Sequence, residues 1–353
     1  MRNIIFDCER MKYSSTGLYH YCLNLGQHLR QKLETSNEEK LTFFSPPQVQ
    51  PLLGCGPGHI TQHSLQKFFM PSLKGYDIWH CTYQNSHYVP KRNKKIRVVL
   101  TIHDLNFLYE SKPESKRKKH LQHLQENIDR SDAIVCISGF CRKDVMLHCK
   151  VGSKPVHVIL NGTNNLQAPD LASDSYKPKN PFLFSLGVIS PKKNFHVLLP
   201  LLKLNRHLEL LIAGRTNDQD YLNFIYASAR KLRVDENLRM LGSISEGEKS
   251  WYYRNCYAFA LPSIAEGFGL PVAEAMSVGK PVFLSARTAL PEIGSNVAFY
   301  FQDFSATHMQ RVFTQGMQTY QEKKMEQAIV KHSENFSWDK AVEQYLNVYR
   351  SLY

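Results

Sequence analysis

Apolar strand-like runs alternate with helical patterns along nearly the whole chain, and this alternation restricts the fold more than any other feature. It is typical of α/β proteins with parallel sheets. Helices are predicted near 18–33 and 114–130, where apolar residues recur at helical spacing. In the first half, strands are predicted at 3–6, 41–44, 78–81, 98–103, 133–137 and 156–160.

A second alternating series begins after a polar stretch. Residues 163–181 are rich in Pro, Asn, Ser and Asp without apolar periodicity, which predicts a linker. We therefore expect two Rossmann-like doubly wound domains, at 1–168 and 176–337, with ligands in a cleft at the carboxyl ends of their strands. The second series predicts strands at 182–186, 208–213, 238–241, 257–261 and 282–285, and helices at 194–204, 220–232, 245–256 and from Pro271.

Composition favours a cytoplasmic globular protein. Apolar residues make up 42% and charged residues 21% of the chain, which excludes a disordered chain. No apolar run is long enough to span a membrane, and the start has too short an apolar run for a signal peptide. The eight cysteines form no CxxC pair, which favours reduced thiols over disulfides or a structural metal site.

The net charge of +13 is concentrated in the first half of the chain. Residues 1–165 carry 23 Lys and Arg against 13 Asp and Glu, whereas the remainder carries 21 against 18. Basic residues cluster in 91–97 and 111–120, and the second cluster opposes the dipole of the helix that it begins. The alternatives are a solvated basic surface and an anionic partner: a phospholipid surface, a phosphorylated acceptor or nucleic acid.

The stretch AEGFGLPVAEAMSVGKP, residues 265–281, places Glu266 and Glu274 on either side of a glycine-containing turn. The turn follows a predicted strand and leads into a helix at Pro271. Glycines let backbone approach a ligand, and a helix N-terminus offers N–H groups to an anion such as a diphosphate. Glu274 is expected in the first helical turn, either as a capping carboxylate or as an acceptor for ribose hydroxyls.

Three other polar motifs have both a functional and a structural interpretation. Asp218 and Asp220 resemble a metal-binding Asp-x-Asp pair, but their place before a helix favours capping. His103 ends a predicted strand and is followed by Asp104, which favours a role in the site. For His80, also at a strand end, both interpretations remain open.

The segment EGFGLPVAEAMSVGKPV resembles the E-x7-E motif of retaining glycosyltransferases of family 4, which have the GT-B fold of two Rossmann-like domains. The resemblance covers most of the chain and implies a C-terminal helix, 338–353, that returns to the N-terminal domain. Other segments that match the family in order are SSTGLYHYCLNLGQHL, TIHDLNF, CISGFCRKDV, ILNGTN, SLGVISPKKNFHVLL, LLIAGR, NLRMLGSIS and FSWDKAVEQYLNVY.

The resemblance assigns catalytic roles to three residues. Glu266 and His103 would contact the donor sugar, and Lys193 would neutralise the departing phosphate. Glu274 would hold the ribose. The full set of donor-binding residues that it implies is Gly17, Lys192, Arg215, Gly267, Phe268, Gly269, Leu270 and Glu274.

The sequence departs from the family pattern at two positions. Val188 stands where many members carry an arginine, so Lys192 and Arg215 are the candidates to supply that charge. Ala265 precedes Glu266, where an aromatic residue is common, and the change would widen the donor pocket.

The resemblance implies a retaining hexosyltransferase with a nucleotide-sugar substrate and neither a cofactor nor a metal. Mannose from GDP-mannose is the expected donor, with UDP-glucose, UDP-galactose and UDP-N-acetylhexosamine open. The expected acceptor is a growing glycan, lipid-linked or part of a lipopolysaccharide or polysaccharide, at the inner leaflet of the cytoplasmic membrane. The alternatives are a non-catalytic sugar-nucleotide-binding subunit and a nucleic-acid-binding protein; nucleic acid is not expected, because aromatic residues do not interleave with the lysines.

Overall fold

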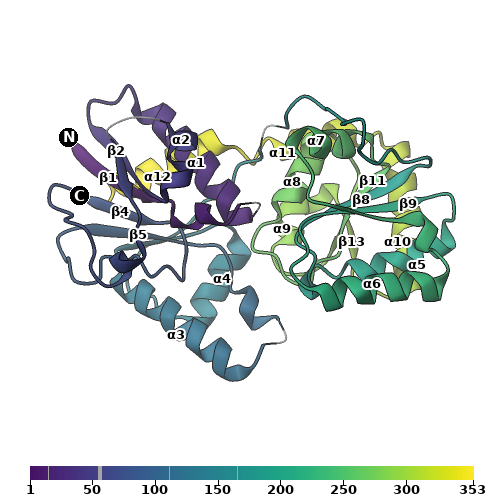
Figure 1. The fold of residues 1–353 in the computed structure, drawn as a ribbon, viewed down its shortest axis with the longest axis horizontal. Coiled ribbons are helices and arrows are strands. Elements are labelled where there is room, and N and C mark those ends of the chain that lie inside the picture. Colours follow the sequence, from purple (N-terminus) through teal and green to yellow (C-terminus); the bar gives the residue numbers. More distant parts are fainter. Residues whose placement is uncertain (15, 55–57, 111, 165) are drawn as a thin grey trace. The chain divides into compact units, whose positions relative to one another are not determined.

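The chain forms two compact α/β units, drawn in Figure 1. Unit 1 comprises Met1–Gly162 and Ser337–Tyr353, and unit 2 comprises Thr163–Phe336. The computed structural model describes residues 1–14, 16–54, 58–110, 112–164 and 166–353. Within those ranges, no helix is both long and apolar enough to cross a membrane.

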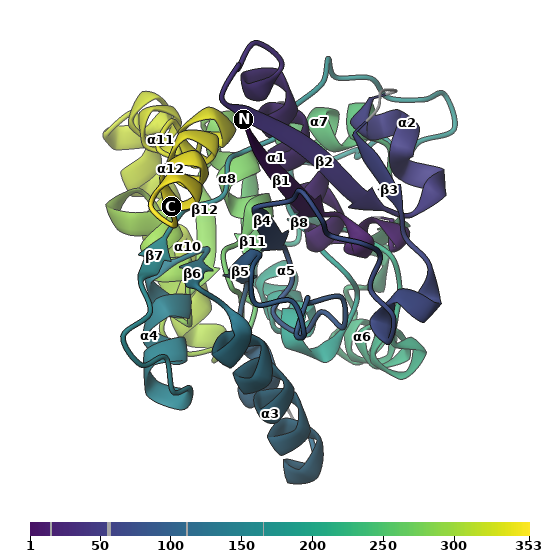
Figure 2. The same ribbon diagram turned by 90° about the vertical axis from the view of Figure 1, so that its left-hand side faces the viewer.

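Unit 1 is built on a seven-stranded parallel sheet with the order β3-β2-β1-β4-β5-β6-β7. Figure 2 shows β1, β2 and β3 side by side. The strands are β1 (Arg2–Asp7), β2 (Glu39–Ser45), β3 (His59–Thr61), β4 (Ile78–Cys81), β5 (Arg97–Ile102), β6 (Ala133–Cys136) and β7 (Val156–Val158). The helices are α1 (Gly17–Leu33), α2 (Gln50–Leu53), α3 (Glu114–Arg130), α4 (Gly139–His148) and α12 (Trp338–Arg350).

Strand alternation gives the sheet of unit 1 two apolar faces. Ile4 and Phe6 of β1 pack in a cluster with residues of α1 and α12. Ile5, between them, packs in a second cluster with residues of α3 and α4. Successive side chains of a strand point to opposite faces, so the middle of this strand, from Ile4 to Phe6, is apolar on both faces, as expected for a parallel sheet covered on both sides.

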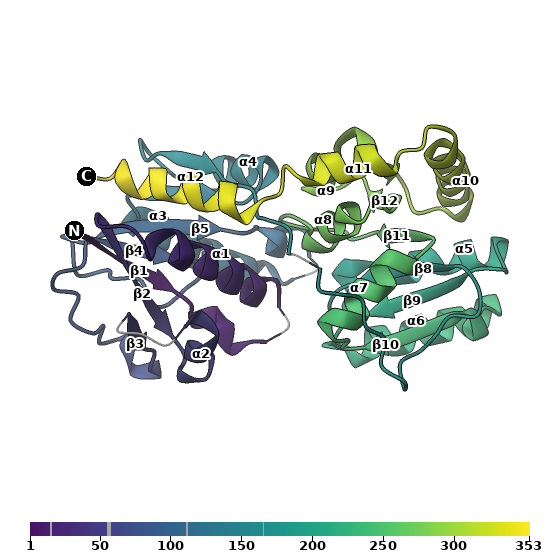
Figure 3. The same ribbon diagram turned by 90° about the horizontal axis from the view of Figure 1, so that it is seen from above.

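The chain returns to unit 1 through α12, which lies beside α1 (Figure 3). Its apolar residues recur at helical spacing, and its tyrosines carry polar contacts into the core. The Tyr345 hydroxyl lies 2.7 Å from that of Tyr21. At the end of the helix, Arg350 Nε donates to Glu39 Oε1 at 2.6 Å.

Unit 2 is built on a six-stranded parallel sheet with the order β10-β9-β8-β11-β12-β13. Its strands are β8 (Phe182–Leu186), β9 (Glu209–Ala213), β10 (Leu238–Gly242), β11 (Ala258–Leu261), β12 (Val282–Ser285) and β13 (Phe299–Phe301). Its helices are α5 (Leu199–Leu204), α6 (Gln219–Leu232), α7 (Glu246–Asn255), α8 (Leu270–Ser277), α9 (Leu290–Gly294), α10 (Ala306–Glu322) and α11 (Glu326–Ser333).

Both sheets have the doubly wound strand order, so the predicted fold class is confirmed. In each sheet the order reverses once, between β1 and β4 in unit 1 and between β8 and β11 in unit 2. Ligands of open parallel sheets bind outside the carboxyl ends of the strands at such a switch point. Functional side chains are therefore expected at the two switch points.

Two details differ from the sequence-based expectation. The division between the units falls at Gly162 instead of 168, and the expected linker, residues 163–181, belongs to unit 2. Hydrogen bonds tie it there: Thr163 N–H donates to Phe336 O at 2.9 Å, and Asp170 N–H to Gly247 O at 3.2 Å. The three-residue strands β3 and β13 were not predicted.

Candidate functional site

The switch point of unit 2 carries a buried ion pair. Lys193 lies in a short 3-10 helix, Pro191–Lys193, after β8, and Glu266 lies in the loop after β11. Lys193 Nζ is 2.6 Å from Glu266 Oε1, and the side chains are only 10% and 12% exposed. The structure thus brings together two of the three predicted catalytic residues from loops 73 residues apart.

The charges around Glu266 keep it ionised. Burial alone would raise its pKa, but the charges of Lys193 and Lys192 and the hydrogen bond from Lys193 outweigh burial and hold the pKa below the ordinary value. The backbone N–H of Glu266 donates to Thr288 Oγ1 at 2.9 Å, which fixes the loop. A carboxylate is therefore held beside an ammonium at the carboxyl edge of the sheet.

Two glycines allow the loops after β8 and β9 to meet. A Cβ at Gly214 would lie 2.0 Å from the carbonyl oxygen of Gly187, and one at Gly187 would lie 2.9 Å from Cε of Lys193. Both residues have positive φ, 140° and 157°, which favours glycine. Gly187 therefore leaves room for the Lys193 side chain beside the backbone.

The glycine turn leads into α8 as predicted, with Gly269 as N-cap at φ 106° and Pro271 in the first turn. Leu270 begins the helix, and Gly267 is buried beside it. The start of the helix carries a partial positive charge; Pro271 has no N–H group, and the N–H groups of Val272 and Ala273 donate to the Gly269 carbonyl. Phe268, a predicted donor-binding residue, is 3% exposed and packs edge-to-face on Phe336, with ring centroids 5.5 Å apart.

Glu274 lies in the second turn of α8, so the expected place in the first turn was wrong. The helix begins at Leu270, which puts Glu274 beyond the reach of a cap. The side chain is 4% exposed. Its Oε1 accepts from Lys249 Nζ and Asn164 Nδ2, both at 3.0 Å, and its Oε2 accepts from the Tyr253 hydroxyl at 3.0 Å. About one of the carboxylate's four acceptor positions is left for a further donor.

Sequence reasoning missed the residues that hold Glu274. Lys249 and Tyr253 lie on α7, one turn apart and facing α8. Burial opposes the charge of Lys249, but Glu274 and Glu246 outweigh it and raise the pKa. Burial, followed by the charge of Glu274, raises the pKa of Tyr253 well above its ordinary value. The i, i+4 spacing of Lys249 and Tyr253, which puts both side chains on one face of a helix, was the signal in the sequence.

Two more predicted residues lie in unit 2, and the first of them directly precedes Lys193 in the sequence. Lys192, partly exposed, accepts through its carbonyl from Ile264 N–H at 2.7 Å and adds positive charge near Glu266. Arg215 follows β9 with an exposed side chain, and its carbonyl accepts from Ile189 N–H at 2.9 Å. The predicted capping role of Asp218 is confirmed, since its side chain accepts from Tyr221 N–H at the start of α6.

In unit 1, His103 lies directly after β5 and is 8% exposed. Its Nε2 is 2.8 Å from the carbonyl oxygen of Thr82, so Nε2 carries the proton and Nδ1 the lone pair. Its ring packs edge-to-face on Tyr21, with centroids 4.6 Å apart. Burial lowers the pKa of His103 to about 4, although the hydrogen bond to Thr82 opposes the shift. The imidazole is therefore neutral at pH 7.

Two further residues of unit 1 were considered from the sequence: His80, whose role was left open, and Gly17, a predicted donor-binding residue. His80 is fully buried between Thr101 Oγ1, 2.8 Å from Nε2, and the Tyr349 hydroxyl, 2.6 Å from Nδ1, which supports its structural interpretation. Gly17 begins α1, capped by the side chain of Thr16. Within the described part of the chain, nothing lies within 4 Å of a Cβ built at Gly17.

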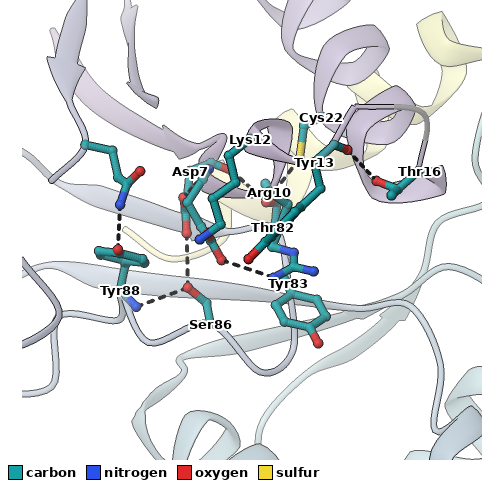
Figure 4. Close-up of polar contacts among 12 residues, drawn as sticks. Asp7, Arg10, Lys12, Tyr13, Thr16, Cys22, Thr82, Tyr83, Ser86 and Tyr88 are labelled. Carbon is teal, nitrogen blue, oxygen red and sulfur yellow. Dashed lines mark hydrogen bonds and ion pairs between the residues drawn. The ribbon is translucent and has the colours of Figure 1, made fainter. Parts of the chain in front are cut away.

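A polar cluster that the sequence did not predict occupies the switch point of unit 1 (Figure 4). Asp7 ends β1, and its Oδ1 accepts from the N–H of Glu9 at 2.9 Å. Lys12 Nζ lies 2.9 Å from Glu9 Oε2. The Arg10 guanidinium lies over the ring of Tyr83, 4.4 Å from its centroid. Burial, then the charge of Glu9, raises the pKa of Asp7 well above its ordinary value.

Two family models match the chain. The model described as "Glycosyl transferases group 1" matches residues 171–325, and "Glycosyltransferase Family 4" matches residues 36–165. O-antigen chain mannosyltransferase B of Escherichia coli is 24% identical over 400 residues, covering 99% of this chain and 100% of that protein. O-antigen chain mannosyltransferase RfbU of Salmonella typhimurium is 26% identical over 206 residues, 57% of this chain and 56% of that protein.

Solved structures with the same fold cover the whole chain. Sucrose-phosphate synthase from Thermosynechococcus elongatus has a TM-score of 0.78 at 18% identity, covering 100% of this chain and 99% of that one. Anabaena Alr3699/HepE, in complex with UDP and glucose, has a TM-score of 0.74 at 17% identity, covering 99% and 100%. At these identities the likeness shows the fold alone.

Proposed function

The chain belongs to the glycosyltransferases of group 1 and family 4 and has the GT-B fold, and from this premise we propose that it transfers a hexose from a nucleotide sugar to a growing glycan. The transfer retains the anomeric configuration and needs no metal. Unit 2 binds the donor, and unit 1 binds the acceptor. The observation that carries the proposal is the buried pair of Lys193 and Glu266 at the switch point of unit 2.

The pair suits the departure of a nucleoside diphosphate. Breaking the bond between sugar and phosphate leaves negative charge on the diphosphate and positive charge at the anomeric carbon. We assign stabilisation of the first charge to the Lys193 ammonium and the positive end of the α8 dipole, and contact with the sugar to the Glu266 carboxylate, 2.6 Å from Lys193 Nζ. Lys192 adds a second cation near the same carboxylate.

No protein nucleophile is assigned. The acceptor hydroxyl attacks the face of the sugar from which the diphosphate leaves, and it gives its proton to the departing phosphate oxygen. His103 is neutral at pH 7 because burial holds its pKa at about 4. Because its Nε2–H donates to the Thr82 carbonyl oxygen, His103 offers Nδ1 as an acceptor for a sugar hydroxyl.

Mannose from GDP-mannose is the donor we propose to test first, since several of the curated relatives are named as mannosyltransferases. Glu274 accepts hydrogen bonds from the ribose through the acceptor position that its protein partners leave. Thermal unfolding with GDP, UDP, TDP and ADP tests the nucleotide, because a ligand at 100 times its dissociation constant adds about 2.7 kcal/mol. Equal stabilisation by all four would contradict the assignment.

The acceptor we propose is a glycan of the lipopolysaccharide or polysaccharide class, carried on a lipid at an anionic membrane surface. The names of the relatives and the positive charge of residues 1–165 support this class. Transfer of radiolabelled mannose to lipid-extracted acceptor, by the wild type and by Lys193→Met, tests the reaction. Equal transfer by both proteins would remove Lys193 from it, and donor binding without transfer to any acceptor would indicate a non-catalytic subunit.

A further inference from the structure

Unit 1 exposes three large apolar side chains within five residues. Leu65, Phe68 and Phe69 are 70%, 72% and 75% exposed. They lie in and directly after a 3-10 turn, Ser64–Lys67, which follows the edge strand β3. Single exposed apolar residues are ordinary on a protein surface, but a contiguous group marks an interaction site. We call Leu65, Phe68 and Phe69 the apolar turn.

The conformation of the apolar turn is held by local hydrogen bonds. Phe68 N–H and Phe69 N–H both donate to the Leu65 carbonyl at 3.0 Å. His63 and Gln66 form a reciprocal capping box around the start of the turn. These bonds satisfy backbone groups that would otherwise be costly to place in an apolar medium.

The turn is also anchored to the core on its C-terminal side. Leu73 is buried in the second apolar cluster of unit 1, and Met70 packs against the same cluster. The chain therefore buries Leu73 and partly buries Met70 behind the apolar turn, while the turn itself faces solvent. This is the arrangement of a short segment that presents side chains outward from a fixed base.

The charge around the apolar turn is positive. Lys67 lies within it and Lys74 follows it, both exposed, and the sequence has no Asp or Glu between Glu39 and Asp77. Lys67 Nζ lies 5.9 Å from the centroid of the Tyr88 ring. A segment that combines exposed aromatic residues with lysine and has no Asp or Glu in its sequence matches a negatively charged membrane interface.

Contacts in unit 1 join this turn to the basic helix α3. The Tyr88 hydroxyl accepts from Gln62 Nε2, just before the turn. The neighbouring His87 packs its ring on His123 of α3, with centroids 4.5 Å apart. Further along, Lys91 forms an ion pair with Glu126 of α3 at 2.8 Å.

The loop of residues 90–96, which contains Lys91, carries further exposed cations. Arg130 of α3 donates to the carbonyl oxygens of Pro90, Asn93 and Ile96, which fixes the loop against the helix. Arg92, Lys94 and Lys95 on this loop are exposed. The apolar turn and the basic clusters at 91–97 and 111–120 are thus linked parts of one unit.

We propose that the apolar turn inserts into the interface of an anionic phospholipid membrane, with Lys67 and Lys74 at the headgroups. The inference rests on the proposed function, because it supplies the membrane contact of an enzyme whose acceptor is carried on a lipid. It goes further in assigning binding to insertion of Leu65, Phe68 and Phe69 in addition to charge. Such two-part binding has a salt-sensitive and a salt-resistant component.

Sedimentation with vesicles tests the proposal. The probes are vesicles of phosphatidylcholine alone and of phosphatidylcholine with phosphatidylglycerol in equal parts. Changing all three side chains to serine should lower the partition coefficient on the mixed vesicles by at least about 100-fold, since burying one phenylalanine is worth roughly tenfold or more. The triple serine variant of Leu147, Leu204 and Phe224, which are exposed elsewhere in the chain, should bind like the wild type.

Insertion itself is measured by fluorescence. Phe69→Trp should show blue-shifted emission on the mixed vesicles and quenching by phosphatidylcholine brominated on its acyl chains, whereas Phe224→Trp should show neither. In about 1 M salt, where the Debye length falls to about 3 Å, the residual binding should still depend on the apolar turn. Binding that salt abolishes completely, with Phe69→Trp unquenched, would overturn insertion.

Other occupants of the apolar turn give different results. A concentration-dependent dimer that the serine variant dissociates, with vesicle binding unchanged, would assign the turn to a second copy and overturn the proposal. The serine variant should still bind GDP and lose transfer to lipid-linked acceptor only. If the wild type inserts into vesicles but transfers no sugar, the proposed function fails while the insertion stands.

Discussion

The two switch points occupy equivalent places in two sheets of the same strand order, yet they treat buried charge in opposite ways. In unit 2, Glu266 is paired with Lys193, and its pKa is lowered. In unit 1, Asp7 is buried beside Glu9, and its pKa is raised. Strand order therefore fixes where polar groups gather, whereas burial and the neighbouring charges set the direction in which their pKa values shift.

We therefore expect an anion to bind at unit 2 and not at unit 1. Lys193 and Lys192 both stabilise negative charge at the carboxyl edge of the sheet in unit 2. In unit 1, the side chain of Glu9 engages Lys12, and the nearby His103 is neutral at pH 7. A neutral imidazole and a carboxylate suit hydroxyl groups better than a diphosphate.

The largest expected effect is on stability and concerns the second buried pair of unit 2. Lys249→Met removes the cation from the buried Glu274 carboxylate, so the free energy of unfolding in urea should fall by about 3–5 kcal/mol. Adding Glu274→Gln should restore part of the loss, because no unpaired charge then remains. A single variant within ~1 kcal/mol of the wild type would show that Lys249 does not hold Glu274.

The next largest expected effect is on catalysis. It tests whether the negative charge that develops on the leaving diphosphate is stabilised in unit 2. Lys193→Met should lower kcat by roughly 100- to 1,000-fold, because a group aimed at developing negative charge is lost. The matched control is Lys203→Met, which removes an exposed lysine of α5 in the same unit. If steady-state kinetics showed that both variants lose activity equally, the special role of Lys193 at the switch point of unit 2 would be contradicted.

A pH prediction separates the two units further. The folded pKa of His103, about 4, lies below its ordinary value of 6.5. As pH falls from 6.5 to about 4, the unfolded chain takes up a proton that the folded chain does not, so stability decreases. His103→Gln should remove on the order of 3 kcal/mol of this acid-induced loss. Urea unfolding at a series of pH values measures it, and parallel curves for both proteins would contradict it.

The smallest expected effect is on Tm, which should shift in opposite directions when the carboxylates of Asp7 and Glu266 are replaced by amides. The raised pKa of Asp7 means that its ionisation opposes folding as pH rises, so Asp7→Asn should raise Tm at pH 7. Glu266 has a lowered pKa, so its contribution is present at pH 7 and lost only as pH falls below 4.5. Glu266→Gln should therefore lower Tm at pH 7. Calorimetric shifts of the same sign would remove the electrostatic difference between the switch points.

The sequence predicted those parts of the fold and site that depend on local pattern. The strands β8 and β11 are largely apolar. Glu266 lies in the loop after β11, directly before a glycine turn. Such a pattern specifies the strand, the loop and the helix start without distant contacts. The family resemblance assigned Lys193 and Glu266 to the donor site, and the structure places Lys193 Nζ 2.6 Å from Glu266 Oε1.

Distant contacts account for what was missed. The partners of Glu274 come from α7 and from Asn164, 25 and 110 residues away, and no local pattern predicts that they converge. The helix start at Leu270 was displaced by one residue from the expected Pro271, enough to misjudge the turn of Glu274. Of the three strands that are only three residues long, the sequence predicted β7 and missed β3 and β13.

The central claim is that the diphosphate of the donor binds at the switch point of unit 2. Isothermal titration calorimetry of GDP with the wild type, Lys193→Met and Lys12→Met tests it directly. Lys193→Met should weaken binding by roughly 10- to 100-fold, the worth of a charge-assisted hydrogen bond to phosphate, and Lys12→Met should bind like the wild type. Unchanged binding by Lys193→Met, or a larger loss in Lys12→Met, would contradict the account.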